Sequence, residues 1–320
     1  MSSKEKKNHH WWPVGLQARY WADKKGYVSW ITPDGIVRKK KAKNRKIAYK
    51  RHGHTISFSD EWKHTFEDDF SIDGEVHRII EGVKEFDPLG TKIRDFRAIF
   101  RKIISGQASS KDFCAYYRIK PDLHRDLLLL ILSLLIRSPA NRDQYEQYPS
   151  IAGLPRNTEI GKANMVQEFR FAKKRITEGP LAGQFFVFLN SPKGRFVFGD
   201  GALDWISREF SYGVPNGRAL ISLTPHLCIY FCTPRLMCSS INCASLVAPT
   251  WLVKEINSIT MACSRQNLFF LGKPPRLTKA YMCGQYLELE SAEIPAINLL
   301  DGISGNQGRN EGVGVGPLNS

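Results

Sequence analysis

Apolar positions recur at helical spacing through the middle of the chain. One stripe with the spacing i, i+4, i+7, i+8 and i+11 is formed by Ile72, Val76, Ile79, Ile80 and Val83. Residues 121–136 are apolar almost all round, which is typical of a helix buried on every side. Residues 157–178 predict a long, polar and basic helix that ends at Gly179-Pro180. The pattern therefore predicts a helical middle from about residue 61 to residue 178.

Strand-forming runs flank this helical middle on both sides. Residues 27–31 and 36–38 lie on either side of Thr32-Pro33-Asp34-Gly35, a turn-like sequence, so they predict a β-hairpin. Later aromatic and β-branched runs predict strands at 185–189, 195–198, 219–223 and 226–231, a helix at about 250–267 and further strands near 281–289. The predicted fold is α+β, with an N-terminal β-hairpin, a helical middle and a mixed C-terminal β region closed by a helix.

One integrated domain over residues 1–301 accounts best for this pattern. A helix that is apolar on all sides needs cover from elements before and after it, and a boundary near residue 180 would remove part of that cover. The last nineteen residues, 302–320, contain no aromatic residue and are rich in Gly and Asn, so they predict a disordered tail.

Charge changes this picture because it is concentrated near the N-terminus. Residues 1–65 contain 16 Lys or Arg and five Asp or Glu, so +11 of the net charge of +15 lies there. Nine cations without an acid fall within residues 38–51, namely Arg38, Lys39, Lys40, Lys41, Lys43, Arg45, Lys46, Lys50 and Arg51. Because side chains alternate along a strand, the second hairpin strand should carry at least one strongly cationic face. This basic run predicts a polyanion partner, although Lys on a solvated edge strand also protects against aggregation.

DNA or RNA is the polyanion that this segment suits best. Trp11, Trp12, Trp21 and Trp30 lie close to the cations in sequence, and indole rings stack on unpaired bases. Two other classes stay open. The cationic hairpin could dock an acidic protein partner while the Trp residues form a small core, or a small-molecule enzyme could use the polar residues discussed below.

The chain is expected to be a cytoplasmic protein that spans no membrane. No apolar run follows the N-terminal MSSKEKKNHH, and the longest apolar run, residues 127–136, is half of the about 20 residues that a membrane helix needs. Seven cysteines form an odd set without a CxxC pair, as expected for reduced, buried thiols. The sequence does not indicate an oligomeric state.

Clustered histidines and acids raise the question of a metal. Six of the eight His fall within the first 77 residues, and His52-Gly53-His54 on a strand would place two rings on one face. Residues 66–75 hold five acids, which could bind Mg²⁺ or Mn²⁺. Isolated His more often packs or faces solvent, and acids in the first turns of a helix favour its dipole. The sequence identifies no particular metal.

Asp200 follows an apolar strand and is flanked by Gly199 and Gly201. Glycines let the backbone approach a ligand closely, but they also suit an ordinary tight turn. A functional and a structural interpretation of this carboxylate both stay open.

The order of several motifs resembles a known family. His10-Trp11-Trp12-Pro13 precedes Leu16 and Tyr20 or Trp21, the core helix ends in Arg137-Ser138-Pro139, Asp200 closes a strand, and Asn257 follows Leu223-Thr224-Pro225-His226-Leu227. This order is similar to that of the bacterial family called domain of unknown function 4238, over about residues 9–270. The resemblance implies a shared site at His10, Arg137, Asp200 and Asn257 and no established activity.

If the protein also cuts the nucleic acid that it binds, it would be a metal-dependent nuclease. His10 would act as general base or metal ligand, Asp200 would bind Mg²⁺ or Mn²⁺ or orient water, and Arg137 would stabilise phosphate charge. These residues and Asn257 could equally be separate structural hydrogen-bonding groups. The basic run supports binding better than it supports cleavage.

Overall fold

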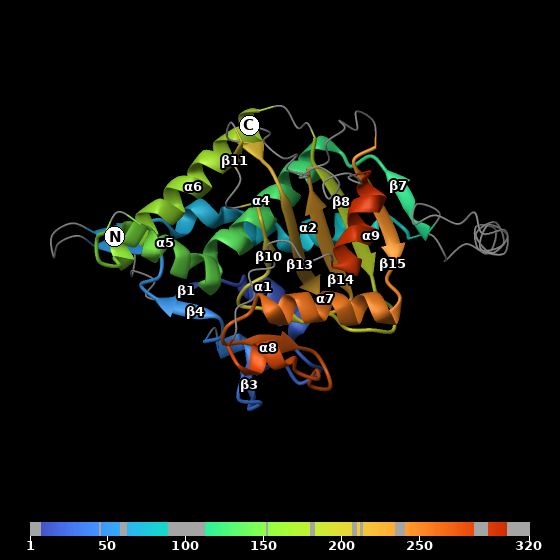
Figure 1. Ribbon diagram of the computed structural model, residues 1–320, viewed down its shortest axis with the longest axis horizontal. Coiled ribbons are helices and arrows are strands. Elements are labelled where there is room, and N and C mark those ends of the chain that lie inside the picture. Colours follow the sequence, from blue (N-terminus) through green and yellow to red (C-terminus); the bar gives the residue numbers. More distant parts are fainter. Residues whose placement is uncertain are drawn as a thin grey trace, which may run out of the picture.

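The computed structural model describes residues 8–44, 46–57, 63–88, 113–151, 153–179, 183–206, 210–211, 214–233, 241–284 and 294–305 (Figure 1). Its helices are α1 (Val14–Leu16), η1 (Gln17–Trp21), η2 (Ala42–Asn44), η3 (Glu67–Glu75), α2 (Val76–Lys84), α4 (Pro121–Arg137), α5 (Pro139–Ile151), α6 (Thr158–Glu178), α7 (Thr250–Ala262), α8 (Lys279–Met282) and α9 (Pro295–Ser304). Its strands are β1 (Asn8–His10), β2 (Tyr27–Ile31), β3 (Val37–Lys41), β4 (Tyr49–Arg51), β5 (Thr55–Ser57), β6 (Lys63–Thr65), β7 (Ala115–Tyr117), β8 (Phe185–Asn190), β9 (Phe198–Gly199), β10 (Leu203–Asp204), β11 (Phe210–Ser211), β12 (Val214–Pro215), β13 (Arg218–Thr224), β14 (Leu227–Cys232), β15 (Cys243–Val247) and β16 (Leu268–Phe270). These elements confirm the predicted α+β fold.

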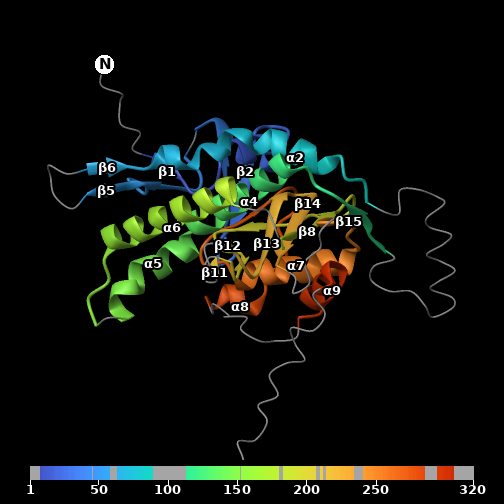
Figure 2. The same cartoon turned by 90° about the horizontal axis from the view of Figure 1, so that it is seen from above.

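A six-stranded sheet in the order β10-β13-β14-β8-β15-β7 forms the centre of the fold (Figure 2). Helices cover both of its faces, so its central strands are apolar on both sides. Phe186 and Phe188 of β8 belong to the core cluster that includes α4. The intervening Phe185, Val187 and Leu189 belong to the cluster that includes α7 and α9. Burial on both faces explains why β8 is a continuous apolar run rather than an alternation.

The predicted hairpin forms, and C-terminal strands extend it into a second sheet. β2 and β3 pair antiparallel, with Trp30 opposite Arg38 and Tyr27 opposite Lys41. β16 pairs with β2 and β9 pairs with β16, which gives the order β3-β2-β16-β9. Residues from both ends of the described chain therefore build this four-stranded sheet.

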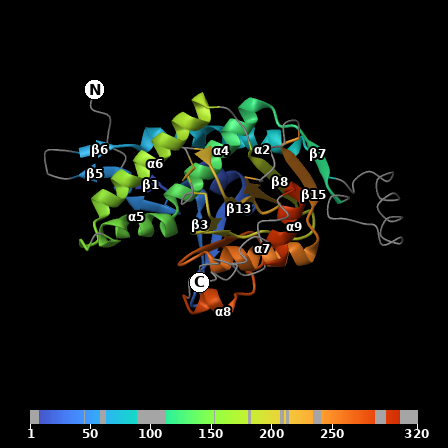
Figure 3. The same cartoon turned by 45° about the horizontal axis from the view of Figure 1, so that its top comes forward.

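The helical middle matches its prediction in the core. The apolar stripe predicted around α2 is buried, and α4 buries every residue from 127 to 137. Asn157 caps α6, since its side-chain oxygen accepts hydrogen bonds from the backbone N–H groups of Glu159 and Ile160. At one end of the molecule α5 and α6 pack together, and α6 also contacts β5 (Figure 3). In the described parts of the chain, no helix has the combined length and hydrophobicity that a bilayer crossing requires.

Strands interrupt the helical middle at two places where helix was predicted. A helical start near residue 61 is wrong, because residues 63–65 form β6 and pair with β5. Residues 115–117 form β7, which pairs with β15 at the edge of the central sheet. Both strands are three residues long, too short for the alternation of side chains to stand out in the sequence.

The C-terminal region also departs from its prediction. The strand expected at 195–198 is reduced to β9, and the helix expected to reach residue 267 ends at Ala262. Tyr281 and Met282, expected in a strand, lie in α8, while residues 285–289 lie outside the described residues. α9 continues through Ser304 with Gly302 buried, so the prediction of a disordered tail is wrong for residues 302–304; residues 306–320 lie outside the described residues.

Candidate functional site

The pairing of β3 separates the cations of the basic run into two groups. Arg38 lies opposite Trp30 and lines a cavity with it, whereas Lys39 and Lys41 lie on the other face of β3. The ammonium groups of Lys39 and Lys41 lie 5.6 and 5.4 Å from the centre of the Tyr27 ring, a cation–π geometry. The basic run therefore presents cations in two directions, as the alternation along a strand predicted.

The cavity beside Arg38, called the cationic cavity below, gathers segments that are far apart in the sequence. It has a volume of about 510 Å³, which is typical of a small-molecule site. Its cations are Arg38, Lys46, Lys50, Arg142, Arg156 and Arg265, and its acids are Asp143, Glu146 and Asp200. Its aromatic side chains are Trp11, Trp30, Tyr49 and Phe269. With six cations and three acids, the lining has a formal charge of +3.

Short N-terminal strands hold part of the aromatic wall. β1 pairs with β4, which places His10 opposite Tyr49. The backbone N–H of Trp11 donates a 3.1 Å hydrogen bond to the Ala48 carbonyl. Tyr49 is 39% exposed, so its ring is open to a ligand, and Trp30 is half-buried beside it in the lining. Trp11 is only 6% exposed and contributes the inner wall of the cavity.

Two of the four Trp residues expected to stack on bases lie in the core. Trp12 and Trp21 are fully buried. The Trp12 ring stacks on Phe198 with ring centroids 4.5 Å apart, and the Trp21 indole N–H donates a 3.0 Å hydrogen bond to the Leu223 carbonyl. The expectation that Trp12 contacts nucleic acid is therefore corrected, because no face of its ring is open.

Lys40, Lys43 and Arg51 of the basic run do not line the cationic cavity. Lys40 is half-buried on β3, while Lys43 and Arg51 are exposed. Arg45 lies outside the described residues. The cavity thus uses Arg38, Lys46 and Lys50 from the basic run.

The two acids that α5 contributes to the cationic cavity are paired with its cations. Asp143 bonds Arg156 at 2.5 Å and also bonds Arg265. Glu146 bonds Arg156 at 2.5 Å and Lys50 at 3.2 Å. Burial alone would raise the pKa of Glu146, but hydrogen bonds and charge from Arg156 and Lys50 outweigh it and lower the pKa. Glu146 therefore stays ionised, and the two carboxylates together position Lys50, Arg156 and Arg265.

Arg142 lies deepest among the cations of the cavity. It is 5% exposed, and its Nη1 donates a 2.9 Å hydrogen bond to the Gly53 carbonyl. Burial lowers the pKa of Arg142 to about 10, opposed by the charge of Glu146, so the guanidinium remains charged at neutral pH.

Asp200 shapes the cavity by holding a loop. Its buried carboxylate accepts hydrogen bonds from the backbone N–H groups of Arg265 at 2.7 Å, Gln266 at 2.9 Å and Asn267 at 3.0 Å. Burial raises the pKa of Asp200, and the three N–H donors oppose that rise. These hydrogen bonds fix the backbone of residues 265–267 after α7 and so hold Arg265 at the cavity.

The glycines beside Asp200 are required by the protein's own backbone. A Cβ on Gly201 would lie 1.9 Å from the Cys263 carbonyl oxygen, and one on Gly199 would lie 1.8 Å from the Ser264 hydroxyl. This close approach favours the structural interpretation of the Gly-Asp-Gly sequence.

Arg137 is fully committed to internal contacts. Its Nη atoms bond the Asp73 carboxylate at 2.8 and 2.6 Å, and the remaining donors bond Ser133 and, at 3.2 Å, the His10 carbonyl. The guanidinium also lies 4.4 Å from the centre of the Phe70 ring. Because these contacts use all five N–H groups, Arg137 has none left for a phosphate, in contrast to the predicted role.

Neither Asn257 nor His10 lines the cationic cavity that Asp200 lines. The Asn257 side chain accepts a 3.0 Å hydrogen bond from the Val197 N–H and donates one of 3.0 Å to the Arg195 carbonyl. It lines a different cavity from the one that Asp200 lines. His10 contacts Arg137 through its carbonyl, and its ring lies 6.2 Å from that of Tyr49. A catalytic role for these residues stays a prediction without a shared pocket to support it.

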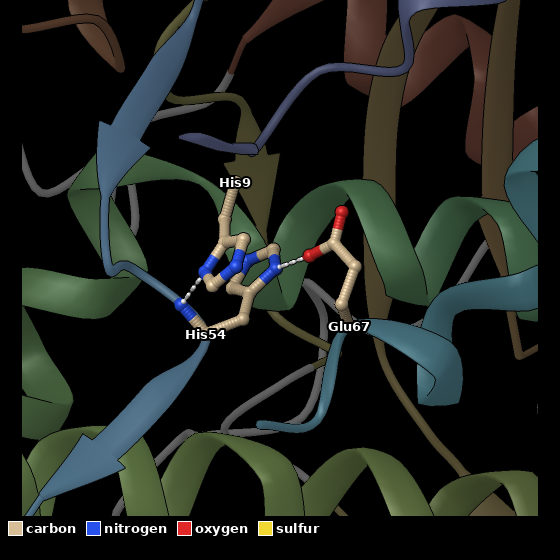
Figure 4. A group of neighbouring side chains, drawn as sticks. All are labelled: His9, His54 and Glu67. Atoms are coloured by element: carbon tan, nitrogen blue, oxygen red, sulfur yellow. Dashed lines mark hydrogen bonds and ion pairs between the residues drawn. The ribbon is translucent and has the colours of Figure 1, made fainter. Parts of the chain in front are cut away.

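His9, His54 and Glu67 form a polar cluster (Figure 4). Arg142 bonds the carbonyl of Gly53, the residue before His54. The buried rings of His9 and His54 stack with centroids 5.1 Å apart and planes 8° from parallel. The His54 backbone N–H donates a 2.7 Å hydrogen bond to Nδ1 of His9, and Nδ1 of His54 bonds the Glu67 carboxylate. Burial, with the positive charges of Arg137 and Arg142, holds the pKa of His54 well below its usual value, so the ring is neutral.

The ligand atoms of this histidine cluster lie within 4.8 Å of one another, close enough to surround a metal ion, but their directions do not suit one. Imidazole lone pairs lie in the ring plane, and two stacked rings do not direct them at one ion about 2.0–2.1 Å from each nitrogen. Nδ1 of His9 already accepts an N–H, which leaves its ring proton on Nε2. The arrangement favours hydrogen-bonded packing of neutral rings over a metal centre.

The predicted pairing of His52 with His54 does not form. His52 has φ +52° and lies in the turn between β4 and β5, so the two rings do not follow one strand. His9 of β1, which is distant in the sequence, stacks on His54 instead.

The acidic segment 66–75 is explained by ion pairs. Asp69 bonds Arg170 of α6 at 2.8 Å, and Asp73 bonds Arg137 of α4 at 2.6 Å. Glu67 belongs to the histidine cluster. These carboxylates reach three different neighbours of η3, so they fasten it to the fold rather than converge on Mg²⁺ or Mn²⁺.

Outside the basic run, most residues of the cationic cavity carry no signal in the sequence. Arg142, Arg156 and Arg265 lie in segments without a local motif, and only folding brings them together. Tyr49 was detectable, because it is an aromatic residue inside the basic run. No family model matches the chain, and no curated protein or solved structure is significantly similar to it.

Proposed function

We propose that this protein binds single-stranded DNA or RNA at the cationic cavity. The observation that carries the proposal is the meeting of six cations with the exposed ring of Tyr49 and the half-buried ring of Trp30 in one concave site. Phosphates bind to Lys and Arg, and unpaired bases stack on aromatic rings. A duplex offers mainly its phosphates, because its bases are already stacked.

Two cations of the cavity are available to phosphate groups. Arg38 and Lys46 form no ion pair with any residue of the described ranges, whereas Lys50, Arg156 and Arg265 share two carboxylates. Arg38 lies on β3 and Lys46 precedes β4, so these two cations reach the cavity from two segments of the basic run. A single strand that enters the cavity can therefore contact both with its phosphates while its bases meet the aromatic rings.

The test is fluorescence anisotropy of labelled single-stranded DNA, single-stranded RNA and duplex DNA with the full chain at two salt concentrations. Single strands should bind more tightly than the duplex, and their affinity should fall with salt as counterions are released. The double variant Arg38→Glu/Lys46→Glu should weaken single-strand binding by about tenfold or more, because two phosphate contacts become repulsive.

The matched control is Lys39→Glu/Lys41→Glu, which makes the same charge change on the opposite face of β3. It should weaken binding much less. Equal losses in both double variants would show that general charge, and not the cavity, attracts the ligand. No binding at low salt would refute the proposal and leave an acidic protein partner or a small molecule as the ligand.

Cleavage of the bound strand is tested on the same samples with Mg²⁺ or Mn²⁺. The three carboxylates of the cavity already bond Arg side chains, Lys50 or backbone N–H groups, so binding is the activity that the contacts support. Metal-dependent products that disappear in His10→Ala would establish the predicted nuclease. Intact strands would limit the activity to binding.

We also propose that the protein works in a reducing compartment such as the cytoplasm. Cys114, Cys228, Cys232, Cys243 and Cys263 are buried without disulfide bonds. Burial raises the pKa of Cys114, Cys228 and Cys243 to about 12, so these thiols are unreactive at neutral pH. Labelling with a thiol reagent before and after unfolding tests this, since the buried thiols should react only after unfolding.

The resemblance to domain of unknown function 4238 leads to a proposal of common descent. Its support is the order of the His-x-x-Pro element, Arg137-Ser138-Pro139, Asp200 and Asn257 along the chain. A structure of a family member tests this proposal. We expect the corresponding helix to end in an Arg that makes the same internal bonds as Arg137.

A further inference from the structure

A second cationic cavity, called the α7 groove below, lies on the opposite face of the four-stranded sheet. Phe269 and Phe270 are consecutive residues of β16, so their side chains point to opposite faces. Phe269 lines the cationic cavity, and Phe270 lines the α7 groove. The groove has a volume of about 730 Å³ and is bordered by α7 and by the loop between β16 and α8.

The charged residues that line the α7 groove are all cations. They are Arg195, Lys254, Lys273 and Arg276. None of the four forms an ion pair within the described part of the chain; Arg195 Nη1 lies 3.4 Å from Nε2 of His226. Four like charges around one hollow repel one another, and an anion placed between them relieves that repulsion.

The chain holds these cations on rigid supports. Asn257 fixes the backbone on both sides of Phe196, through the Arg195 carbonyl and the Val197 N–H. Lys273 and Arg276 flank Pro274-Pro275, which restricts the backbone between them. Such supports reduce the ordering cost of binding a ligand.

The end of this loop is also anchored. Thr278 accepts a hydrogen bond from the Tyr281 N–H at the start of α8, and the Tyr281 hydroxyl donates one of 2.9 Å to the Ile31 carbonyl. The loop that carries Lys273 and Arg276 is therefore tied to β2 as well as to β16.

The lining of the α7 groove also contains apolar side chains, among them Met261, Phe270 and Leu277. A ligand that fits it has several negative charges close together and an apolar or planar part. We propose that the α7 groove binds a nucleotide by its phosphate chain, which contacts the cations, while the base lies against the apolar lining. Recognition is by side-chain cations, and the site is separate from the nucleic-acid site proposed above.

The experiment is isothermal titration of the full chain with ATP and, separately, with inorganic tripolyphosphate. Saturable binding is expected for both, and tighter binding of ATP would show that the base contributes. The double variant Lys254→Glu/Arg276→Glu should weaken both affinities by about tenfold or more, since two charge-assisted contacts are lost. Lys39→Glu/Lys41→Glu, with the same charge change outside both cavities, should leave ATP binding unchanged.

Three results would overturn the proposal. They are no saturable binding of either ligand at millimolar concentration, unchanged affinity in Lys254→Glu/Arg276→Glu, and equal losses in the two double variants. Single-stranded DNA binding is measured on the same variants. If Lys254→Glu/Arg276→Glu abolishes DNA binding but not ATP binding, the groove belongs to the nucleic-acid surface and the nucleotide proposal fails.

Discussion

At the scale of the residue, chemical type did not decide role. Arg137 and Asp200 have the chemistry of a phosphate-binding cation and a catalytic carboxylate, yet both are saturated by bonds within the chain. A buried charge is costly unless every polar atom finds a partner, so the fold surrounds it with donors or acceptors. The sequence shows that a charged side chain is present. Only its contacts in the fold show whether its hydrogen-bonding groups are still available to a ligand.

Removing the carboxylate that pairs with Arg137 should destabilise the protein. Asp73→Ala leaves a buried guanidinium without its counter-ion, which costs about 3–5 kcal/mol when such a pair is broken. Urea unfolding measures the loss. Asp69→Ala, at the half-exposed pair with Arg170, is the control and should cost less than about 1 kcal/mol. Similar losses at the two sites would contradict a structural role for Arg137.

The buried ring of His124 should make the stability of the protein sensitive to acid. Burial lowers its pKa from 6.5 to about 4, and its Nδ1 has no hydrogen-bond partner among the described residues. Between these pH values the unfolded chain binds a proton that the folded ring does not, so the free energy of unfolding falls as pH falls. The loss is about 1.4 kcal/mol per pH unit and levels off below about pH 4.

Unfolding by urea between pH 4 and 7 measures this effect, with His124→Phe as the comparison. The variant keeps an aromatic ring against Phe186 but cannot be protonated. The free energy of unfolding of the variant should fall less steeply with decreasing pH than that of the parent. The difference should correspond to the uptake of about one proton on unfolding. Parallel pH dependences would show that His124 is not responsible.

The histidine cluster should be indifferent to metals. Its rings are stacked and His9 Nδ1 is occupied, so neither EDTA nor added Zn²⁺ should shift the melting temperature. Differential scanning fluorimetry makes the comparison. A saturable rise with Zn²⁺ that disappears in His54→Ala would show that the rings rearrange around an ion.

At the scale of the element, burial pattern proved more reliable than chemistry. α4 and β8 were predicted because elements covered on all sides must be apolar at every position. The hairpin was predicted because its turn residues and strand residues agree. β6, β7 and β9 were misjudged because two or three residues carry too little pattern, and pairing with distant strands decides their conformation.

The contact between α5 and α6 illustrates how elements position the site. A Cβ on Gly161 of α6 would lie 2.6 Å from Cγ and 2.8 Å from Cα of Glu146 on α5. Gly161→Ala should therefore push the helices apart, cost about 1–3 kcal/mol of unfolding free energy and displace the carboxylate that holds Lys50 and Arg156.

The measurement is urea unfolding together with single-strand affinity. Gly74→Ala is the control, because nothing lies within 4 Å of a Cβ built there. Stability close to the parent in Gly161→Ala would show that the two helices can separate at little cost, and the account of their packing would be wrong.

At the scale of the whole molecule, segments from both ends of the chain share one sheet. β2, near the N-terminus, pairs with β16, and α4 packs beneath strands from residues 185–232. This interleaving supports the expectation of a single integrated domain. Tryptophan fluorescence, to which the buried Trp12 and Trp21 contribute, and far-UV circular dichroism should therefore give coincident urea transitions. Two separated transitions would show independently folding parts.

The order of residues along the chain was enough to predict the elements whose patterns are long or locally consistent, namely the hairpin, the core helix, the polar helix after Asn157 and the continuous apolar strand. It also determined that positive charge is concentrated near one end. Tertiary structure decided which charges remain available. Arg38 and Lys46 face a cavity that Arg142 and Arg265 complete from distant segments. Trp12 is buried in the core, and Arg137 and Asp200 already make hydrogen bonds within the chain. The reason is physical: periodicity depends on neighbours along the chain, whereas a site and the occupancy of a hydrogen-bonding group depend on neighbours in space.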